Sequence, residues 1–132
     1  MSGVSFGGIQ TLLSAEKGLG IVSFVPFAPG AMSWTAVPEL HDRLKLAILK
    51  ATAPIFMIQA ENDYSLGPTE FLGPVLDCKG PPNQHKLYPP FMPQLGHFAG
   101  HAGFAEWPAG ISIWRGDVLR FLITTGGLSS GN

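Results

Sequence analysis

Short apolar runs alternate with amphipathic stretches along the chain. Residues 21–25 (Ile-Val-Ser-Phe-Val) and 55–58 (Ile-Phe-Met-Ile) have the length and the β-branched, aromatic character of buried strands. A third strand is predicted over 84–88, because Pro89 and Pro90 stop the segment directly after it. The pattern therefore predicts three short strands that are well separated along the chain.

Helices are predicted before, between and after these strands, from apolar stripes at helical spacing and from glycine and proline at the ends. They begin at Gly7, Pro38, Pro68 and Trp114 and end near Gly18, Ala51, Pro74 and Leu122, with Pro74 expected to kink or shorten its helix. The glycine- and histidine-rich stretch 91–110 is predicted to be a loop. Strands that alternate with helices are typical of an α/β fold with a parallel sheet.

The segment Gly3-Val4-Ser5-Phe6-Gly7-Gly8 matches the pattern G-x-S-x-G. In α/β-hydrolases this pattern forms the nucleophile elbow, a strained turn that exposes the serine hydroxyl ahead of a helix. The glycines let the backbone pass where side chains have no room. We therefore predict Ser5 as a nucleophile, with the Phe6 N–H as one donor of an oxyanion hole. The competing interpretation is a glycine-rich helix start.

A serine nucleophile needs a base, and the base needs a carboxylate that holds its tautomer. Asp63 is the predicted acid because it follows the strand over 55–58 in a polar loop, and Glu61 is the alternative. An ordinary turn aspartate is the competing interpretation of Asp63. His97 and His101, each preceded by glycine, are the two candidates for the base. No third ligand stands at convincing spacing from them, so no metal site is predicted.

Taken together, five segments resemble the carboxyl-terminal portion of the dienelactone-hydrolase-like family of α/β-hydrolases. They are Gly3 to Gly8, 27–34, 58–64, 88–91 and 114–122, and they span nearly the full chain. The resemblance implies the roles of nucleophile for Ser5 and acid for Asp63. It implies the role of base for one glycine-preceded histidine, and the spacing to Trp114 favours His101 over His97. Trp34 and Tyr64 are candidates for a substrate pocket, against an equal case for ordinary packing.

Dienelactone hydrolases proper use cysteine in the elbow, and this chain has serine. The resemblance therefore implies a serine hydrolase that cleaves carboxylic esters or lactones, with a small ester or lactone as substrate and no cofactor. A family member also has several strands and helices before the elbow. We therefore expect a partial α/β-hydrolase fold over residues 1–123, with the amino-terminal part of the sheet missing and a flexible tail over 124–132.

The alternative is a truncated, inactive fragment that self-associates or pairs with a missing amino-terminal half. Under either interpretation we expect the strand before Ser5 to be essentially absent, residues 21–25 to form an open hydrophobic edge, and the second oxyanion donor to come from the missing part.

Composition narrows the partners and the compartment. Charged residues make up 13 % of the chain and the net charge is −1, without a Lys/Arg cluster, so no nucleic-acid partner is expected. The apolar stretch 21–32 is broken by Pro26, Pro29 and Gly30, and it is too short for a membrane span. We see no signal peptide, and a single cysteine, Cys78, suits a reducing compartment. The expected location is the cytoplasm.

Overall fold

The computed structural model describes residues 1–129. Four parallel strands form one sheet in the order β1-β2-β3-β4. The strands are β1 (Ser2–Val4), β2 (Val25–Phe27), β3 (Phe56–Ala60) and β4 (Gln84–Tyr88). The helices are α1 (Phe6–Lys17), α2 (Glu39–Lys50), α3 (Gly67–Lys79), α4 (Gly96–Phe98), α5 (Phe104–Glu106) and α6 (Pro108–Thr124). The predicted α/β class and parallel sheet are confirmed.

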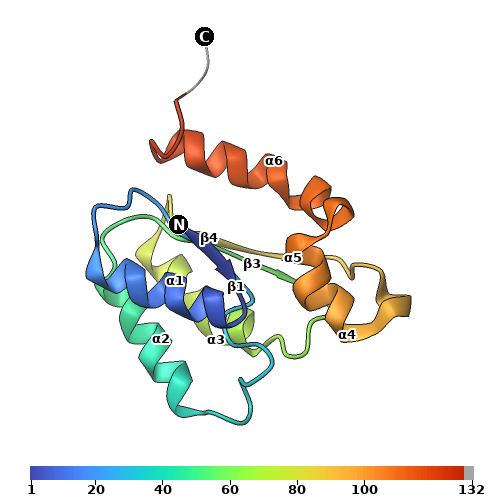
Figure 1. Ribbon diagram of the computed structural model, residues 1–132. Coiled ribbons are helices and arrows are strands. Elements are labelled where there is room, and N and C mark those ends of the chain that lie inside the picture. The colour runs from blue at the N-terminus through green and yellow to red at the C-terminus, as the bar shows by residue number, and fades with distance from the viewer. Residues whose placement is uncertain (130–132) are drawn as a thin grey trace.

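Helices cover both faces of the sheet. In Figure 1, α1, α2 and α3 lie on one face and α6 lies on the other. Each face has its own apolar core. On the first face, Leu12, Ile48 and Leu76 from the three helices pack with the strand residue Met57 and its neighbours. On the second face, Phe121 of α6 belongs to a cluster with side chains from β2, β3 and β4. Alternate residues of each strand therefore serve opposite cores.

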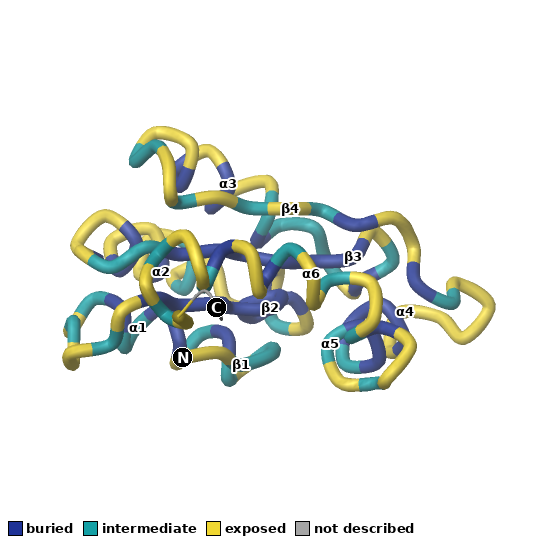
Figure 2. Tube along the Cα trace, turned by 90° about the horizontal axis from the view of Figure 1, so that it is seen from above, coloured by how far each residue is buried: buried dark blue, intermediate teal, exposed yellow. Residues whose placement is uncertain are grey.

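The two inner strands are the buried ones. Every residue of β2 and β3 is buried, whereas β1 and the first four residues of β4 are partly or fully exposed. Figure 2 shows the same contrast along the trace, with β2 and β3 dark blue and most of β4 in lighter colours. The carboxyl ends of the buried strands thus give the loops that follow them a rigid base.

The prediction of a strand over 21–25 with an open edge is wrong. The strand β2 begins at Val25 and includes Pro26, and β1 lies beside it with Gly3 opposite Pro26. Val25 donates to Met1 O, whereas Phe24 and Ala28 donate towards the β3 side. Pro26 therefore falls on the β3 side, where its missing N–H removes only one donor from the ladder. A three-residue strand does precede Ser5.

Two other boundaries differ from the prediction. The helix α3 continues through Pro74 to Lys79, because Val75 and Leu76 bury their side chains beyond the proline. The stretch 91–110 is mostly helical instead of a loop. It contains a 3-10 turn (Pro93–Leu95), α4, a π-helical turn (Ala99–Gly103), α5 and the start of α6. The predicted tail begins at the last residue of α6, and its residues 130–132 lie outside the described residues.

A polar contact joins the edge strand β4 to α6. The buried Tyr88 hydroxyl donates to Asp117 Oδ2, and Lys86 Nζ lies 2.7 Å from the same oxygen. Hydrogen bonds, first from Lys86 and then from Tyr88, hold the pKa of Asp117 below its ordinary value. Burial, together with the Asp117 bond, raises the pKa of Tyr88. The contact fixes α6 over the end of the sheet.

We expect Asp117→Asn to destabilise the fold by about 1 kcal/mol at neutral pH, because the ionised carboxylate accepts both bonds. A carboxyl whose pKa is lowered in the folded state contributes stability above its unfolded value, and this contribution is lost as the pH falls. The gap in thermal midpoint between wild type and Asp117→Asn should therefore narrow as the pH drops below 3.8, the ordinary value for this carboxyl. Thermal unfolding followed by circular dichroism measures it. A gap that stays constant down to pH 3 would contradict the role of the charge.

Candidate active site

Ser5 occupies a strained turn between β1 and α1. Its backbone has φ 58° and ψ −114°, a conformation that residues other than glycine rarely adopt. Neighbouring segments hold the turn in place: Ser5 N donates to Phe27 O at 3.0 Å, and Ser5 O accepts from Ile9 N and Gly30 N. The end of β2, the loop at Gly30 and the first turn of α1 therefore hold Ser5 in the strained conformation. A strained turn between a strand and a helix is also the backbone geometry that a nucleophile elbow requires, so the prediction for Ser5 stays open.

The motif glycines differ in how much the turn needs them. A Cβ on Gly3 would lie 2.5 Å from Gly7 O, and one on Gly8 would lie 2.7 Å from Phe27 O. A Cβ on Gly7 would meet nothing within 4 Å. The close passage of backbone past backbone thus requires Gly3 and Gly8. The last glycine of the G-x-S-x-G pattern, Gly7, has no steric need in this turn.

This difference gives a matched pair of variants. We expect Gly3→Ala to cost about 1–3 kcal/mol of stability, because the added methyl group forces backbone apart at the turn. Gly7→Ala should be neutral or stabilising by up to about 1 kcal/mol, since alanine favours the helix in which Gly7 lies. Urea unfolding of both variants measures the difference. Equal stability of the two would contradict the steric account.

Asp63 lies in the turn directly after β3. Its side chain is fully buried, and Oδ1 accepts from Tyr64 N while Oδ2 accepts from Gln59 Nε2 at 3.1 Å. The alternative acid, Glu61, is exposed at the same turn. A buried carboxylate is stable only when donors surround it, and Asp63 has them.

Of the two candidate histidines, His101 contacts Asp63. His101 Nδ1 lies 2.8 Å from Asp63 Oδ1, and the His101 side chain is 4 % exposed. The exposed His97 instead places Nδ1 3.1 Å from Asn62 O. A carboxylate oxygen can only accept, so a neutral His101 ring that bonds Asp63 Oδ1 through Nδ1 carries its proton on that nitrogen. The geometry therefore favours His101 over His97 as the partner of Asp63.

The other ring nitrogen of His101 is free. His101 Nε2 is buried and has no hydrogen-bond partner among residues 1–129, so it is not bonded to Ser5 Oγ. Ser5 follows β1 and Asp63 follows β3, and the strands are parallel, so both residues lie at the carboxyl edge of the sheet. In Figure 1 the arrows of β1 and β3 point towards the side where α4 and α5 carry the histidine segment. In proteins without bound substrate, catalytic hydrogen bonds are often long or poorly aligned and tighten when substrate binds.

The predicted oxyanion donor and the two predicted pocket residues differ in how they lie relative to Asp63 and His101. As the first residue of α1, Phe6 has a backbone N–H without an acceptor in its own helix. The Tyr64 ring, 40 % exposed, lies edge-on to His101 at 5.3 Å between centroids. Trp34 is buried, stacks on His41 at 4.1 Å and belongs to the core under α1–α3. A substrate-pocket role for Trp34 and Tyr64 remains a prediction.

Sequence reasoning passed over two residues beside Asp63. The buried Gln59 of β3 bonds Asp63, Ser65 and Thr69 through its side-chain amide. Asn62 bonds both backbone groups of Phe91 and also Gly96 O. A Cβ on Gly100 would lie 2.5 Å from Asn62, so the histidine segment passes close against this turn. A glutamine inside an otherwise apolar strand was the available signal for the first of them.

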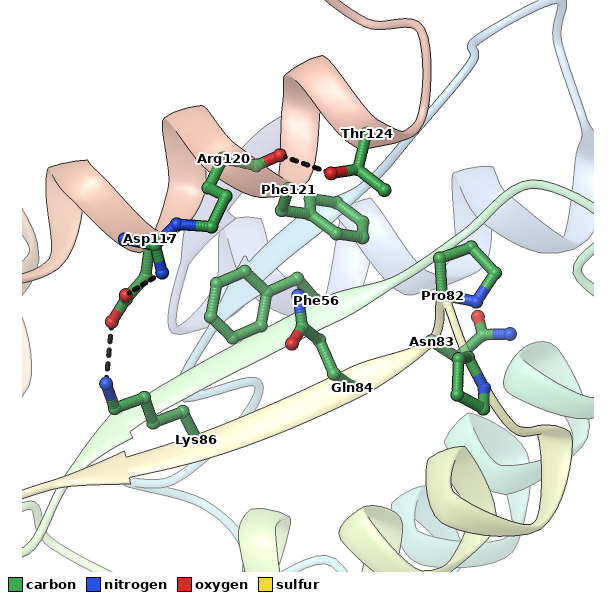
Figure 3. Close-up of a pocket in the computed structure, with 10 residues that line it drawn as sticks. Phe56, Pro82, Asn83, Gln84, Lys86, Asp117, Arg120, Phe121 and Thr124 are labelled. Carbon is green, nitrogen blue, oxygen red and sulfur yellow. Dashed lines mark hydrogen bonds and ion pairs between the residues drawn. The ribbon is translucent and has the colours of Figure 1, made fainter.

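A groove of about 460 Å³ lies elsewhere, between α6 and the starts of β3 and β4. In Figure 3 the rings of Phe56 and Phe121 lie next to each other there, tilted by 60°, and Lys86 points towards Asp117. None of Ser5, Asp63 and His101 lines it. This groove therefore contributes nothing to the candidate site.

Within residues 1–129, no group of three or more His, Cys, Asp or Glu side chains is placed to hold a metal ion. None of the helices in that range has both the length and the apolar character needed to cross a membrane.

No protein-family model and no curated protein sequence matches the chain. Among solved structures, it is similar to esterase B from Lactobacillus rhamnosis HN001, with a TM-score of 0.64 and 16 % identity. It is also similar to an esterase B structure with a C4-C4 tributyrin phosphonate inhibitor, with a TM-score of 0.59 and 16 % identity. Each match covers 96 % of this chain and 52 % of the esterase chain. The likeness shows a shared α/β fold, and the chain spans about half the length of these esterases.

Proposed function

We propose that the chain forms part of a serine hydrolase that cleaves carboxylic esters or lactones through an acyl-Ser5 intermediate. One observation carries the proposal: the buried Asp63–His101 pair, with Nε2 free, lies at the same sheet edge as the strained Ser5 turn. The resemblance to the dienelactone-hydrolase-like family and the fold shared with esterase B support the same reaction class.

The proposed reaction begins when His101 Nε2 accepts the proton of Ser5 Oγ while Oγ attacks the ester carbonyl carbon. The carbonyl oxygen gains negative charge, which the Phe6 N–H and the positive end of α1 stabilise. His101 then donates the proton to the departing alcohol oxygen, and the acyl group stays on Ser5. A water molecule attacks the acyl carbon by the same route and releases the acid.

Asp63 acts on His101 instead of on the substrate. Its Oδ1 holds the Nδ1 proton and thus leaves the lone pair on Nε2 free to accept the serine proton. The same carboxylate stabilises the imidazolium that forms when the proton arrives. Because the Asp63 side chain is fully buried, little water screens this interaction.

The exposed Tyr64 ring next to His101 offers apolar surface for a small acyl or alcohol group. A tributyrin phosphonate inhibits esterase B, so short-chain esters are the first substrates to test here. Lactones are the alternative substrates for the same reaction. In a lactone the alcohol oxygen and the acyl group belong to one ring, so the released alcohol stays attached to the acyl chain.

Pre-steady-state hydrolysis of p-nitrophenyl butyrate tests the proposal. We expect a rapid release of up to one equivalent of p-nitrophenol per chain, because acylation precedes slower deacylation. Peptide mass spectrometry of acid-quenched protein should then find a butyryl group on Ser5. Because the chain spans about half of the esterase B chain, the assay also measures what these residues achieve by themselves.

A catalytically matched control is His97→Ala, which should give the same burst. Turnover without an acyl group on Ser5, or an acyl group on another residue, would contradict the proposed intermediate. An absence of turnover and of acylation would contradict the proposed activity for this chain.

A further inference from the structure

Gln59 is a polar residue in the most buried strand of the sheet. Its side chain stands among the apolar residues of β3 and is 1 % exposed. A buried primary amide is costly unless all its donors and acceptors find partners. Apolar packing alone does not explain a glutamine at this position, but the hydrogen bonds of its side-chain amide do.

Every polar atom of the Gln59 amide has a partner. Nε2 donates to Asp63 Oδ2 at 3.1 Å and to Ser65 O at 2.5 Å. Oε1 accepts from Thr69 N at 3.3 Å and from Thr69 Oγ1 at 2.6 Å. The orientation of the amide follows from these partners, because the Thr69 N–H donates only. A flipped amide would set Oε1 against the Asp63 carboxylate, acceptor against acceptor.

These bonds divide the two Asp63 oxygens between two tasks. Oδ2 is held by Gln59, and Oδ1 is left to Tyr64 N and His101 Nδ1. Rotation of the carboxylate would break both sets of bonds at once. We infer that Gln59 is a positioning residue, which locks the Asp63 carboxylate in the orientation that holds His101. The inference rests on the proposed function only for its kinetic consequence.

Gln59 achieves this without changing the charge of the pair. Its amide is neutral, so Asp63 keeps the full negative charge that stabilises a protonated His101. Lysine or arginine at this position would neutralise the carboxylate, and glutamate would repel it. The same amide pins the loop from Asp63 to Thr69, because Ser65 and Thr69 are its other partners.

The test compares two variants that each remove a hydrogen-bonding amide, that of the buried Gln59 and that of the half-buried Asn83. Gln59→Met keeps the approximate shape and removes the donor to Asp63. Asn83→Ala removes an amide whose Oδ1 accepts from Ile55 N just before the opposite end of β3, far from the site in sequence and register. We expect Gln59→Met to lower kcat for p-nitrophenyl butyrate by about 10–100-fold with KM nearly unchanged. Asn83→Ala should lower the unfolding temperature but leave kcat within about twofold.

If Gln59→Met does not fold, Thr69→Val provides a milder variant for the same test. It removes the Oγ1 bond to Gln59 and keeps the backbone bond, so the amide is loosened and not lost. We expect kcat to fall by about threefold at unchanged KM. The kcat of the variant that is tested, Gln59→Met or Thr69→Val, is compared with that of Asn83→Ala. If the two values are equal, Gln59 has no positioning role.

Proton NMR of the full chain gives a readout that needs no turnover. The Nδ1 proton of His101, assigned by its loss in His101→Ala, should resonate at low field because it is bonded to a buried carboxylate. In Gln59→Met we expect this signal to shift or broaden, and in Asn83→Ala to stay. If the wild-type chain shows no Ser5-dependent turnover, the proposed function fails while this signal still decides the role of Gln59. An unchanged signal in Gln59→Met overturns the inference.

Discussion

Replacing Ser5 with alanine is expected to lower ester turnover by at least about 10³-fold and to abolish covalent labelling by a fluorophosphonate probe. The proposed reaction has no other group to carry the acyl intermediate, and the loss of one triad member removes most of the rate advantage of the whole set. The fold should survive, because alanine has the same Cβ as serine at φ 58° and therefore keeps the same backbone strain.

Ser112→Ala is the matched control, because Ser112 lies in α6 and its hydroxyl donates to Ala109 O of the same helix. It should keep both turnover and labelling. Circular dichroism of both variants separates an effect on chemistry from an effect on folding. Labelling or turnover that survives in Ser5→Ala would show that another residue is the nucleophile.

Ser5→Gly tests the strain separately. Glycine adopts positive φ without a steric penalty, so this variant should unfold at a higher temperature than Ser5→Ala. Such a gain would show that the elbow stores conformational strain that the surrounding contacts hold in place.

Local pattern predicted two of the strands and two of the helices: the strands over 55–58 and 84–88, and the helices that begin near Gly7 and Pro38. The strand over 84–88 and the helix from Pro38 to Ala51 lie within a residue of their expected bounds. The short strands near the elbow did not follow from pattern. Three residues of β1 carry too little periodicity, and Pro26 in β2 reads locally as a strand terminator.

The stretch 91–110 shows how tertiary contacts override local propensity. Its glycines disfavour helix, so the sequence alone predicts a loop. In the structure, Phe104 packs on Tyr88 and Phe91, and Trp114 Nε1 donates to Phe104 O. Asn62 holds the entry to this segment through Phe91 and Gly96. These partners are 10 or more residues away, beyond the reach of any local pattern.

Tertiary contacts also explain why the sequence pattern alone could not decide which of the two histidines is the base. His97 and His101 stand four residues apart on a helical segment, and both rings lie near Tyr64, at 5.6 and 5.3 Å. Burial and a carboxylate partner distinguish the two histidines, and neither property can be predicted from their spacing in the sequence. Only the resemblance to a family carried a preference.

His101→Ala is therefore expected to lower kcat/KM for p-nitrophenyl butyrate by about 10³-fold or more, whereas His97→Ala should stay within about threefold of wild type. His101 is the ring with a buried carboxylate on Nδ1 and with no partner for Nε2 among residues 1–129, while exposed His97 places Nδ1 against a backbone oxygen. Asp63→Asn should approach the loss of His101→Ala, because an amide that donates towards Nδ1 stabilises the wrong tautomer. Its effect should add little in the double variant His101→Ala/Asp63→Asn, since the two residues act as one unit. If His97→Ala shows the large loss instead, or if the two losses add fully, Asp63 and His101 do not work as a pair.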